Sequence, residues 1–267
     1  MDHPVLNHTF APNGHAPAVL YLHGFLGCGD DWSELVNRLG RGFSHLTVDL
    51  PGHRRPAHSL PLEYYAMPGC AELIVSLLDH LRIERCHLVA YSMGGRLALF
   101  LLTHYPDRFL SAVIESASLG LKTEAERTAR RQQDQLWIER LRERPIDEFL
   151  HDWYAQSLFQ TMDRSKPRFE RMLRSRSEHD PSALALSLQH MGTGAMPSLW
   201  DNLSDITIPL LFVAGEQDEK YCALAQEMAN LCPRAQVAII PGAGHNVHFE
   251  RPEAFGEAVA QFLRQDS

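Results

Sequence analysis

Short apolar runs alternate with stretches of helical periodicity along the first part of the chain. Residues 18–22, 46–48 and 113–114 predict strands because each is a short apolar or β-branched run, and the first two are followed by glycine- or proline-rich turns. Residues 67–81 carry their apolar positions at helical spacing instead. Strands that alternate with helices in this way indicate βαβ units and a parallel sheet.

The middle of the chain lacks this alternation. Between residues 121 and 200 the strand signals vanish, while arginine, glutamine, glutamate and tryptophan become more frequent. Helices are predicted over 124–142 and 182–191, and prolines mark the breaks at Pro145, Pro167 and Pro181. The simplest interpretation of a helical insert in an α/β chain is a cap that covers the active site.

The last part of the chain returns to the first pattern. Residues 209–213 and 237–240 predict strands, and residues 253–264 predict a closing helix. The whole pattern predicts the α/β class, with a mostly parallel central sheet flanked by helices. Its expected parts are a first core segment (1–120), an inserted helical cap (121–200) and a second core segment (201–267).

Composition narrows the classes of function. The chain has 267 residues, enough for one large α/β domain or two small ones, and its formal net charge of −8 disfavours a general nucleic-acid binder. It shows neither a signal-peptide pattern nor an apolar run approaching the ~20 residues that span a bilayer. We therefore expect a cytoplasmic protein that does not act on a membrane.

Cysteine and histidine usage gives no sign of a metal site. The five cysteines are odd in number and scattered, which favours reduced thiols over a disulfide framework. The fifteen histidines lack a helical His-x-x-x-His spacing with an acid between them. We expect neither a metal nor another cofactor, a small molecule as the partner, and a monomer or weak homo-oligomer.

The five residues from Ala90 to Gly94 (Ala-Tyr-Ser-Met-Gly) carry the strongest chemical signal. They follow the β-like run 86–89 and precede a helical pattern over 95–102. A serine between small residues at a strand-to-helix turn is typical of the nucleophile elbow of the α/β-hydrolase fold. Small neighbours are needed because the tight turn forces Ser92 into a strained backbone conformation.

Chain order predicts the partners of Ser92, because in this fold an acid and then a histidine follow the serine. Asp218 lies in a loop after the strand 209–213, with Glu216 as an alternative acid. His245 lies in a loop after the strand 237–240, with His248 as its nearest competitor. The predicted triad is therefore Ser92, Asp218 and His245, in which the histidine takes the serine proton and the aspartate orients the imidazole.

An oxyanion hole should accompany the triad. One backbone N–H is expected from Met93, the residue after the serine, and the other from Phe25 in the loop that follows the first clear strand. His23 in the same loop is expected to brace it rather than to take part in the chemistry.

Beyond these shared features, the chain resembles the family of 2-succinyl-6-hydroxy-2,4-cyclohexadiene-1-carboxylate synthases, lyases of menaquinone biosynthesis built on the α/β-hydrolase fold. The resemblance covers almost the whole chain. The serine, acid and histidine motifs are common to the superfamily, whereas the arginine pattern at 126–130, Asp-Trp-Tyr at 152–154 and Met-Gly-Thr-Gly at 191–194 are much more specific. The other matching motifs are Leu-His-Gly-Phe-Leu-Gly at 22–27, Asp-Leu-Pro-Gly-His at 49–53, Tyr-Ser-Met-Gly-Gly-Arg at 91–96, Glu-Ser-Ala-Ser at 115–118, Pro-Ser-Leu-Trp at 197–200, Gly-Glu-Gln-Asp-Glu-Lys at 215–220 and Ala-Gly-His-Asn-Val-His at 243–248.

The resemblance implies elimination rather than hydrolysis. The family removes pyruvate from 2-succinyl-5-enolpyruvyl-6-hydroxy-3-cyclohexene-1-carboxylate, with the serine as a general base that abstracts a ring proton. The oxyanion hole then holds the charge that develops on the succinyl carbonyl. Such chemistry requires a basic oxygen beside the C–H bond and donors aimed at the emerging oxyanion.

A substrate with three carboxylates requires a cationic pocket, and the planar fork of arginine suits carboxylates. Arg96 lies about one helical turn after Ser92 and can face the site. The resemblance implies a cap arginine at Arg130 and a third at Arg176, although counting forward from Trp153 gives Arg174 instead. The remaining pocket positions that it implies are Tyr91, Trp153 and Lys220.

Four positions depart from the family pattern: Ala90 for glycine, Arg54 for glycine, Leu119 for proline and Met196 for glutamine. None of them removes a proposed catalytic group. The alternatives are a serine hydrolase of a carboxylate-bearing ester or carbon–carbon bond substrate, which has the same triad, and a non-catalytic ligand receptor on the same scaffold. Spacing alone does not separate elimination from hydrolysis.

Overall fold

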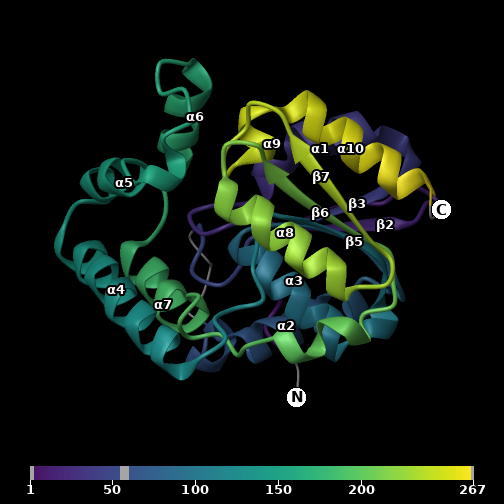
Figure 1. Ribbon diagram of the computed structural model, residues 1–267, viewed down its shortest axis with the longest axis horizontal. Helices are drawn as coiled ribbons and strands as arrows, with labels where there is room; N and C mark the ends of the chain where they lie inside the picture. Colours follow the sequence, from purple (N-terminus) through teal and green to yellow (C-terminus); the bar gives the residue numbers. More distant parts are fainter. Residues whose placement is uncertain (1–2, 55–59, 266–267) are drawn as a thin grey trace.

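The central feature of the computed structural model is a seven-stranded sheet (Figure 1). The structure describes residues 3–54 and 60–265. The strand order is β1-β3-β2-β4-β5-β6-β7, with β1 antiparallel to β3 and every other neighbouring pair parallel. The strands are β1 His8–Ala11, β2 Ala18–Leu22, β3 Ser44–Val48, β4 Cys86–Tyr91, β5 Phe109–Glu115, β6 Leu210–Gly215 and β7 Ala235–Ile240.

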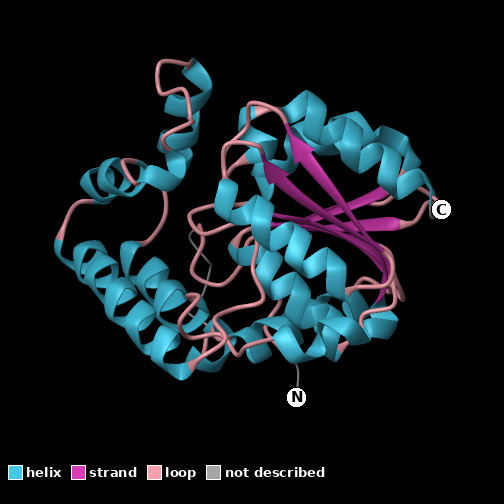
Figure 2. Ribbon diagram, viewed as in Figure 1, coloured by secondary structure: helices cyan, strands magenta, loops and turns pink. Residues whose placement is uncertain are grey.

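Helices cover both faces of this sheet (Figure 2). Successive residues of the central strands point to opposite faces, and both faces are covered, so the runs in β2, β4 and β6 are fully buried and, apart from His87 in β4, apolar. One face packs against α2 (Met67–His80), α3 (Met93–His104) and α8 (Glu219–Leu231). The other packs against α1 (Ser33–Leu39) and α10 (Pro252–Gln265). The α/β class expected from the strand and helix pattern, with a mostly parallel sheet flanked by helices, is confirmed.

The segment between β5 and β6 is helical. Residues 121–200, all of them described, hold α4 (Glu124–Glu143), α5 (Ile146–Tyr154), α6 (Pro167–Arg176) and α7 (Pro181–Met191) and no strand. These four helices lie to one side of the sheet in Figure 1 and share a small apolar core that includes Phe149 and Leu184. Leu26 and Phe25, from the loop after β2, pack into the same cluster. The division into core and cap remains a prediction, but the insert meets the sheet at this loop.

The parallel strands bring the expected chemical motifs to one edge of the sheet. The loops after β2, β4, β5, β6 and β7 all leave from the carboxyl ends of their strands, where ligand sites of open α/β sheets form. The short helix α9 (Val247–Glu250) follows the last of these loops. Among the described residues, no helix has both the length and the apolar character needed to cross a bilayer.

Candidate active site

Ser92 occupies a strained turn between β4 and α3. Its φ of 49° and ψ of −105° place it in the left-handed half of backbone space, and its N–H donates to the carbonyl of Glu115 at 2.9 Å. The turn is tight enough that a Cβ on Gly94 would lie 2.5 Å from the carbonyl oxygens of Leu22 and His23. Ala90, where the elbow usually has glycine, is fully buried in β4. The structure therefore holds Ser92 in the elbow geometry that the motif predicted.

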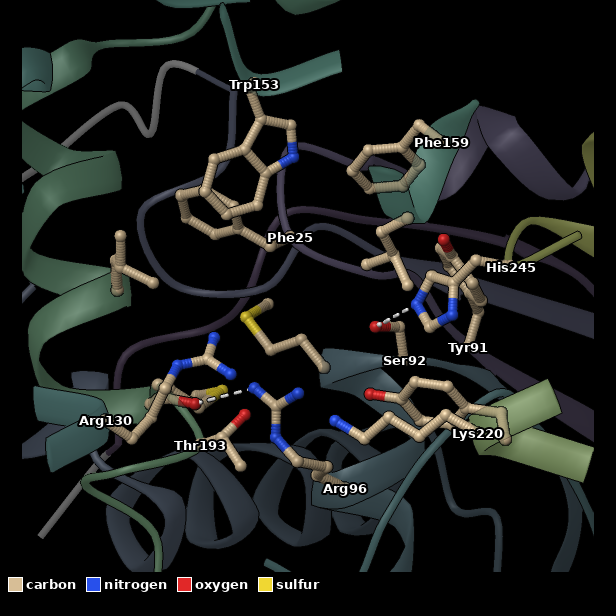
Figure 3. A pocket seen from close by; sticks show the side chains of 16 residues that line it. Phe25, Tyr91, Ser92, Arg96, Arg130, Trp153, Phe159, Thr193, Lys220 and His245 are labelled. Atoms are coloured by element: carbon tan, nitrogen blue, oxygen red, sulfur yellow. Dashed lines mark hydrogen bonds between the residues drawn. The ribbon is translucent and has the colours of Figure 1, made fainter. Parts of the chain in front are cut away.

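The structure brings Ser92, His245 and Asp218 into one hydrogen-bonded line. Ser92 Oγ lies 3.2 Å from His245 Nε2, and His245 Nδ1 lies 2.7 Å from Asp218 Oδ2 (Figure 3 shows the first contact). His245 is 2% exposed. Because its Nδ1–H donates to the Asp218 carboxylate, its Nε2 is left to accept the serine proton. This arrangement can produce a basic serine oxygen without a metal ion.

The two alternative residues have other partners. Glu216 accepts the N–H of Gly242 at 3.0 Å and lies outside the line from Ser92 to Asp218. His248 pairs instead with the fully buried Glu115, which accepts both its Nδ1–H at 2.7 Å and its backbone N–H at 3.0 Å. The geometry thus favours Asp218 and His245 over these competitors.

The predicted oxyanion hole depends on the backbone N–H groups of Phe25 and Met93. Neither Phe25 N–H nor Met93 N–H donates to any residue in the ranges 3–54 and 60–265. His23, which is buried behind this loop, accepts the N–H of Leu50 at Nε2 (2.9 Å) and therefore donates from Nδ1 to the carbonyl of Gly24 (2.7 Å). His23 thus braces the loop, as the sequence predicted, and both N–H groups are available to an oxyanion.

A pocket opens beside Ser92 and collects most of the predicted binding residues. Phe25, Met93 and the twelve other residues described next line it together with the triad serine and histidine (Figure 3). Cations and polar groups come from Arg96, Arg130, Lys220, Thr193, Tyr91 and Tyr221, and apolar groups from Trp153, Leu158, Phe159, Leu188 and Met191, with Gly192. In Figure 3 the charged ends of Arg96, Arg130 and Lys220 point toward one another.

Arg96 is the most unusual of the cations because it is buried without a counter-ion. Its side chain comes from the first turn of α3, donates from Nη2 to the carbonyl of Met191 at 3.0 Å, and leaves its buried Nε without a partner. It forms no ion pair with any carboxylate of the described residues. Burial, together with repulsion from Arg130, lowers the pKa of Arg96 to about 10. A buried and unpaired guanidinium of this kind is suited to bind a carboxylate from outside the protein.

Arg130 and Lys220 contribute more exposed charge. Arg130 donates from Nε to Asp134 at 2.8 Å on the same face of α4, and its side chain is 37% exposed, so its remaining donors are free to meet a ligand. Lys220 Nζ lies 5.5 Å from the ring centre of Tyr221. The three cations therefore line one pocket but differ in burial, with Arg96 the deepest.

The expectation for the third arginine needs correction. Arg176 does not line this pocket. Its Nη2 instead donates to Asp31 at 2.6 Å, in the short helical turn Gly29–Trp32. Although burial acts to lower the pKa of Arg176, Asp31 raises it above its usual range. The alternative, Arg174, is 70% exposed and lies near Glu170 on the surface. Helix packing decides which face of α6 meets the site, and counting along the sequence does not.

Several pocket residues had no clear signal in the sequence. The ring of Tyr221 packs against His245 with 4.6 Å between ring centres, and Tyr221 follows Lys220 directly in the first turn of α8. Burial raises the pKa of the Tyr221 hydroxyl above its ordinary value. Phe159 comes from a short helical turn in the insert and lies 6.0 Å from His245, centre to centre. Phe159 lies in a three-residue turn that has no periodicity, and Tyr221 lies in a helix that the sequence pattern did not single out.

Trp153 closes the pocket from the insert. Its ring packs on Phe25 with 5.0 Å between ring centres and on Trp137 and Phe149 at 5.1 and 5.7 Å. The expected loop residue and the expected cap residue are therefore in direct contact above Ser92. In the part of the chain that the structure describes, no group of three or more His, Cys, Asp or Glu side chains is placed to hold a metal ion.

Comparison with known proteins agrees with the fold. The family model of the α/β-hydrolase fold matches residues 17–252. A Salmonella paratyphi C protein named 2-succinyl-6-hydroxy-2,4-cyclohexadiene-1-carboxylate synthase is 34% identical over 93% of this chain and 94% of its own length. A Bacillus subtilis protein given the same name provisionally is 35% identical over 94% of this chain and 92% of its own. A solved structure titled "Structure of MenH from S. aureus" is 30% identical, covers 100% of this chain and 99% of its own, and has a TM-score of 0.91.

Proposed function

The chain belongs to the 2-succinyl-6-hydroxy-2,4-cyclohexadiene-1-carboxylate synthase family of the α/β-hydrolase superfamily, and from this premise we propose that it eliminates pyruvate from 2-succinyl-5-enolpyruvyl-6-hydroxy-3-cyclohexene-1-carboxylate. A buried, unpaired Arg96 in the same pocket as a histidine-linked Ser92 is the single observation that carries this proposal. A hydrolase of neutral esters does not require a buried guanidinium without a counter-ion, because burying such a charge costs free energy that a neutral substrate does not offset.

We assign proton abstraction to Ser92. Its Oγ passes its proton to His245 Nε2, and the oxygen takes the ring proton whose loss generates an enolate on the succinyl carbonyl. Asp218 keeps the imidazole in the tautomer that accepts at Nε2 and stabilises the imidazolium once it forms. No covalent bond between serine and substrate forms in this sequence.

The free N–H groups of Phe25 and Met93 would stabilise the developing oxyanion. Donors that are already fixed in place stabilise charge in the transition state without reorganising. The enolate then collapses, the ring gains its second double bond, and the C–O bond to the enolpyruvyl group breaks with its electron pair on oxygen. The proton held on His245 returns to the departing group, which leaves as pyruvate, so that the starting protonation state is restored.

The carboxylates of the substrate would meet the three cations that line the pocket. Arg96 offers a forked set of donors at the greatest depth, while Arg130 and Lys220 complete the cationic wall nearer to solvent. Tyr91 and Trp153 would enclose the ring of the substrate. Arg176 has no part in this assignment because Asp31 already holds it.

The expected setting is the cytoplasm, and the expected state is a monomer or weak homo-oligomer. All five cysteines are free, and four of them are buried, which fits a reducing compartment. Size-exclusion chromatography with light scattering tests the oligomeric state.

Pyruvate release from the enolpyruvyl substrate, generated in place by the preceding reaction and followed by lactate dehydrogenase, tests the proposal. We expect release well above the spontaneous background together with negligible turnover of p-nitrophenyl esters. Background-level release with rapid ester turnover would assign the same fold and triad to a hydrolase. Tight binding of the substrate with neither activity would indicate a receptor.

A further inference from the structure

Three buried histidines lie behind the loop that carries Phe25, and none of them belongs to the line from Ser92 to Asp218. His23 follows β2, His53 lies in the turn after β3, and His179 lies between α6 and α7 of the helical insert. Their rings pack in a row, with 4.8 Å between the centres of His23 and His53 and 5.7 Å between those of His53 and His179. Each is 1–3% exposed.

Each of these imidazoles accepts at one nitrogen and donates at the other. His53 accepts the N–H of Leu26 at Nε2 (3.1 Å), so its Nδ1–H donates to the carbonyl of Pro51 (3.2 Å). His179 accepts the N–H of Arg54 at Nδ1 (2.6 Å), so its Nε2–H donates to the carbonyl of Leu26 (2.8 Å). These pairings require neutral rings in fixed tautomers.

The bonds converge on Leu26, the residue that follows Phe25. Its N–H is held by His53 and its carbonyl by His179, so both of its peptide groups are fixed by side chains far away in the sequence. Leu26 has a φ of 66°, which a side chain with a Cβ adopts only when its surroundings enforce it. The Phe25 ring also packs edge-on against His53 at 5.6 Å.

The rings stay neutral under ordinary conditions. Burial lowers the pKa of His53 well below its usual value and lowers the pKa of His179 to about 4. Neighbouring His23 acts in the same direction on both residues. The two hydrogen bonds that His53 and His179 make to Leu26, called the clamp below, therefore persist at neutral pH.

We propose that His53 and His179 are positioning residues that hold Leu26 in its strained conformation and thereby aim the N–H of Phe25 at the oxyanion. This inference rests on the oxyanion role given to Phe25 in the proposed function. It also gives the helical insert a direct connection to the chemistry, because His179 belongs to the insert and reaches the loop through a single hydrogen bond.

Paired substitutions can separate positioning from general support. Glutamine places its amide near the Nε2 of the histidine that it replaces, and asparagine places its amide near Nδ1. At both positions it is Nε2 that contacts Leu26, so glutamine can keep the contact while asparagine loses it and keeps the bond to Arg54 or Pro51 instead. Each variant thus loses one hydrogen bond of two, and a merely structural role predicts similar effects for both.

The experiment measures kcat and KM for pyruvate release in His179→Asn, His179→Gln, His53→Asn and His53→Gln. We expect each asparagine variant to lose about 10- to 100-fold in kcat with little change in KM, as for a displaced catalytic donor, and each glutamine variant to restore most of that loss. His151→Asn, at an exposed histidine of the insert, controls for removal of an imidazole. Equal kcat values for the asparagine and glutamine variants would overturn the proposal.

A second readout is independent of the reaction. In protein labelled with [¹⁵N]phenylalanine, the amide resonance of Phe25 should shift in His179→Asn and return toward its original position in His179→Gln. If the wild-type protein released no pyruvate, the proposed function would fail, yet this resonance would still report whether the clamp sets the Phe25 amide. An unmoved resonance in His179→Asn would refute the clamp itself.

Discussion

Replacing Arg96 with methionine should weaken catalysis and strengthen the fold at the same time. Methionine keeps much of the apolar stem, while the charge and the hydrogen bond to the Met191 carbonyl are lost. The two effects have opposite signs because the free protein carries the cost of burying Arg96, and the substrate carboxylate is what offsets this cost.

The structure sets the size of both effects. Burial lowers the pKa of Arg96 to about 10, a shift that corresponds to about 3 kcal/mol held against the charged form in the folded state. Loss of the hydrogen bond to Met191 costs about 1 to 2 kcal/mol, so we expect a net gain in unfolding free energy of about 1 to 2 kcal/mol. Removing one partner of a buried charge pair, here Arg96 from its pair with a substrate carboxylate, costs about 2 to 5 kcal/mol of transition-state binding. This loss corresponds to a decrease of about 30- to 5,000-fold in kcat/KM.

Urea denaturation and steady-state pyruvate release measure the two quantities on the same preparation. Arg142→Met, at an exposed arginine of α4, is the matched control and should change neither by much. A less stable Arg96→Met protein with unchanged kcat/KM would refute the reasoning, because Arg96 would then serve the fold through Met191 and not the substrate.

Three further outcomes follow from the same geometry. Asp218→Asn should lower kcat by about 10²- to 10⁴-fold while leaving the circular dichroism spectrum unchanged, because the amide no longer fixes the tautomer of His245; near-normal turnover would remove Asp218 from the triad. Gly94→Ala should destabilise the fold by several kcal/mol or displace Ser92, since its Cβ would lie 2.5 Å from two carbonyl oxygens, and a thermal melt with an unchanged Tm would contradict this. The folded-state pKa of His179, about 4, lies below the unfolded value near 6.5, so the unfolded chain binds the extra proton and stability should fall by up to about 3 kcal/mol as pH drops from 6.5 to 4. Denaturation midpoints of His179→Gln that fall as steeply as those of wild type over this range would exclude that contribution.

The elements best predicted from sequence are those whose pattern has one explanation. The runs that became β2, β4 and β6 are buried on both faces, so apart from His87 their residues are apolar and their strands stand out. Edge strand β1 alternates between partly buried and exposed positions over four residues and escaped prediction. Helix α6 escaped it as well, because it is short and rich in arginine, with only Phe169, Met172 and Leu173 as large apolar residues.

The candidate site divides in the same way. Ser92, Asp218 and His245 follow strand ends, and the parallel sheet brings all strand ends to one edge, so order along the chain was enough to place them together. Residues from the insert reach the pocket through helix packing, which sequence spacing does not encode. Trp153 was placed in the pocket by resemblance, whereas Arg176 faces Asp31 instead.

Dependence of pyruvate release on the Ser92 oxygen tests the central claim most directly. Ser92→Ala and Ser165→Ala, the latter at an exposed serine of the insert, are compared with wild type on the enolpyruvyl substrate, and substrate binding is measured in parallel. We predict that Ser165→Ala releases pyruvate as wild type does, while Ser92→Ala still binds substrate and releases pyruvate only at the spontaneous rate. Catalysed release by Ser92→Ala above that rate would contradict the assignment of Ser92 as the base.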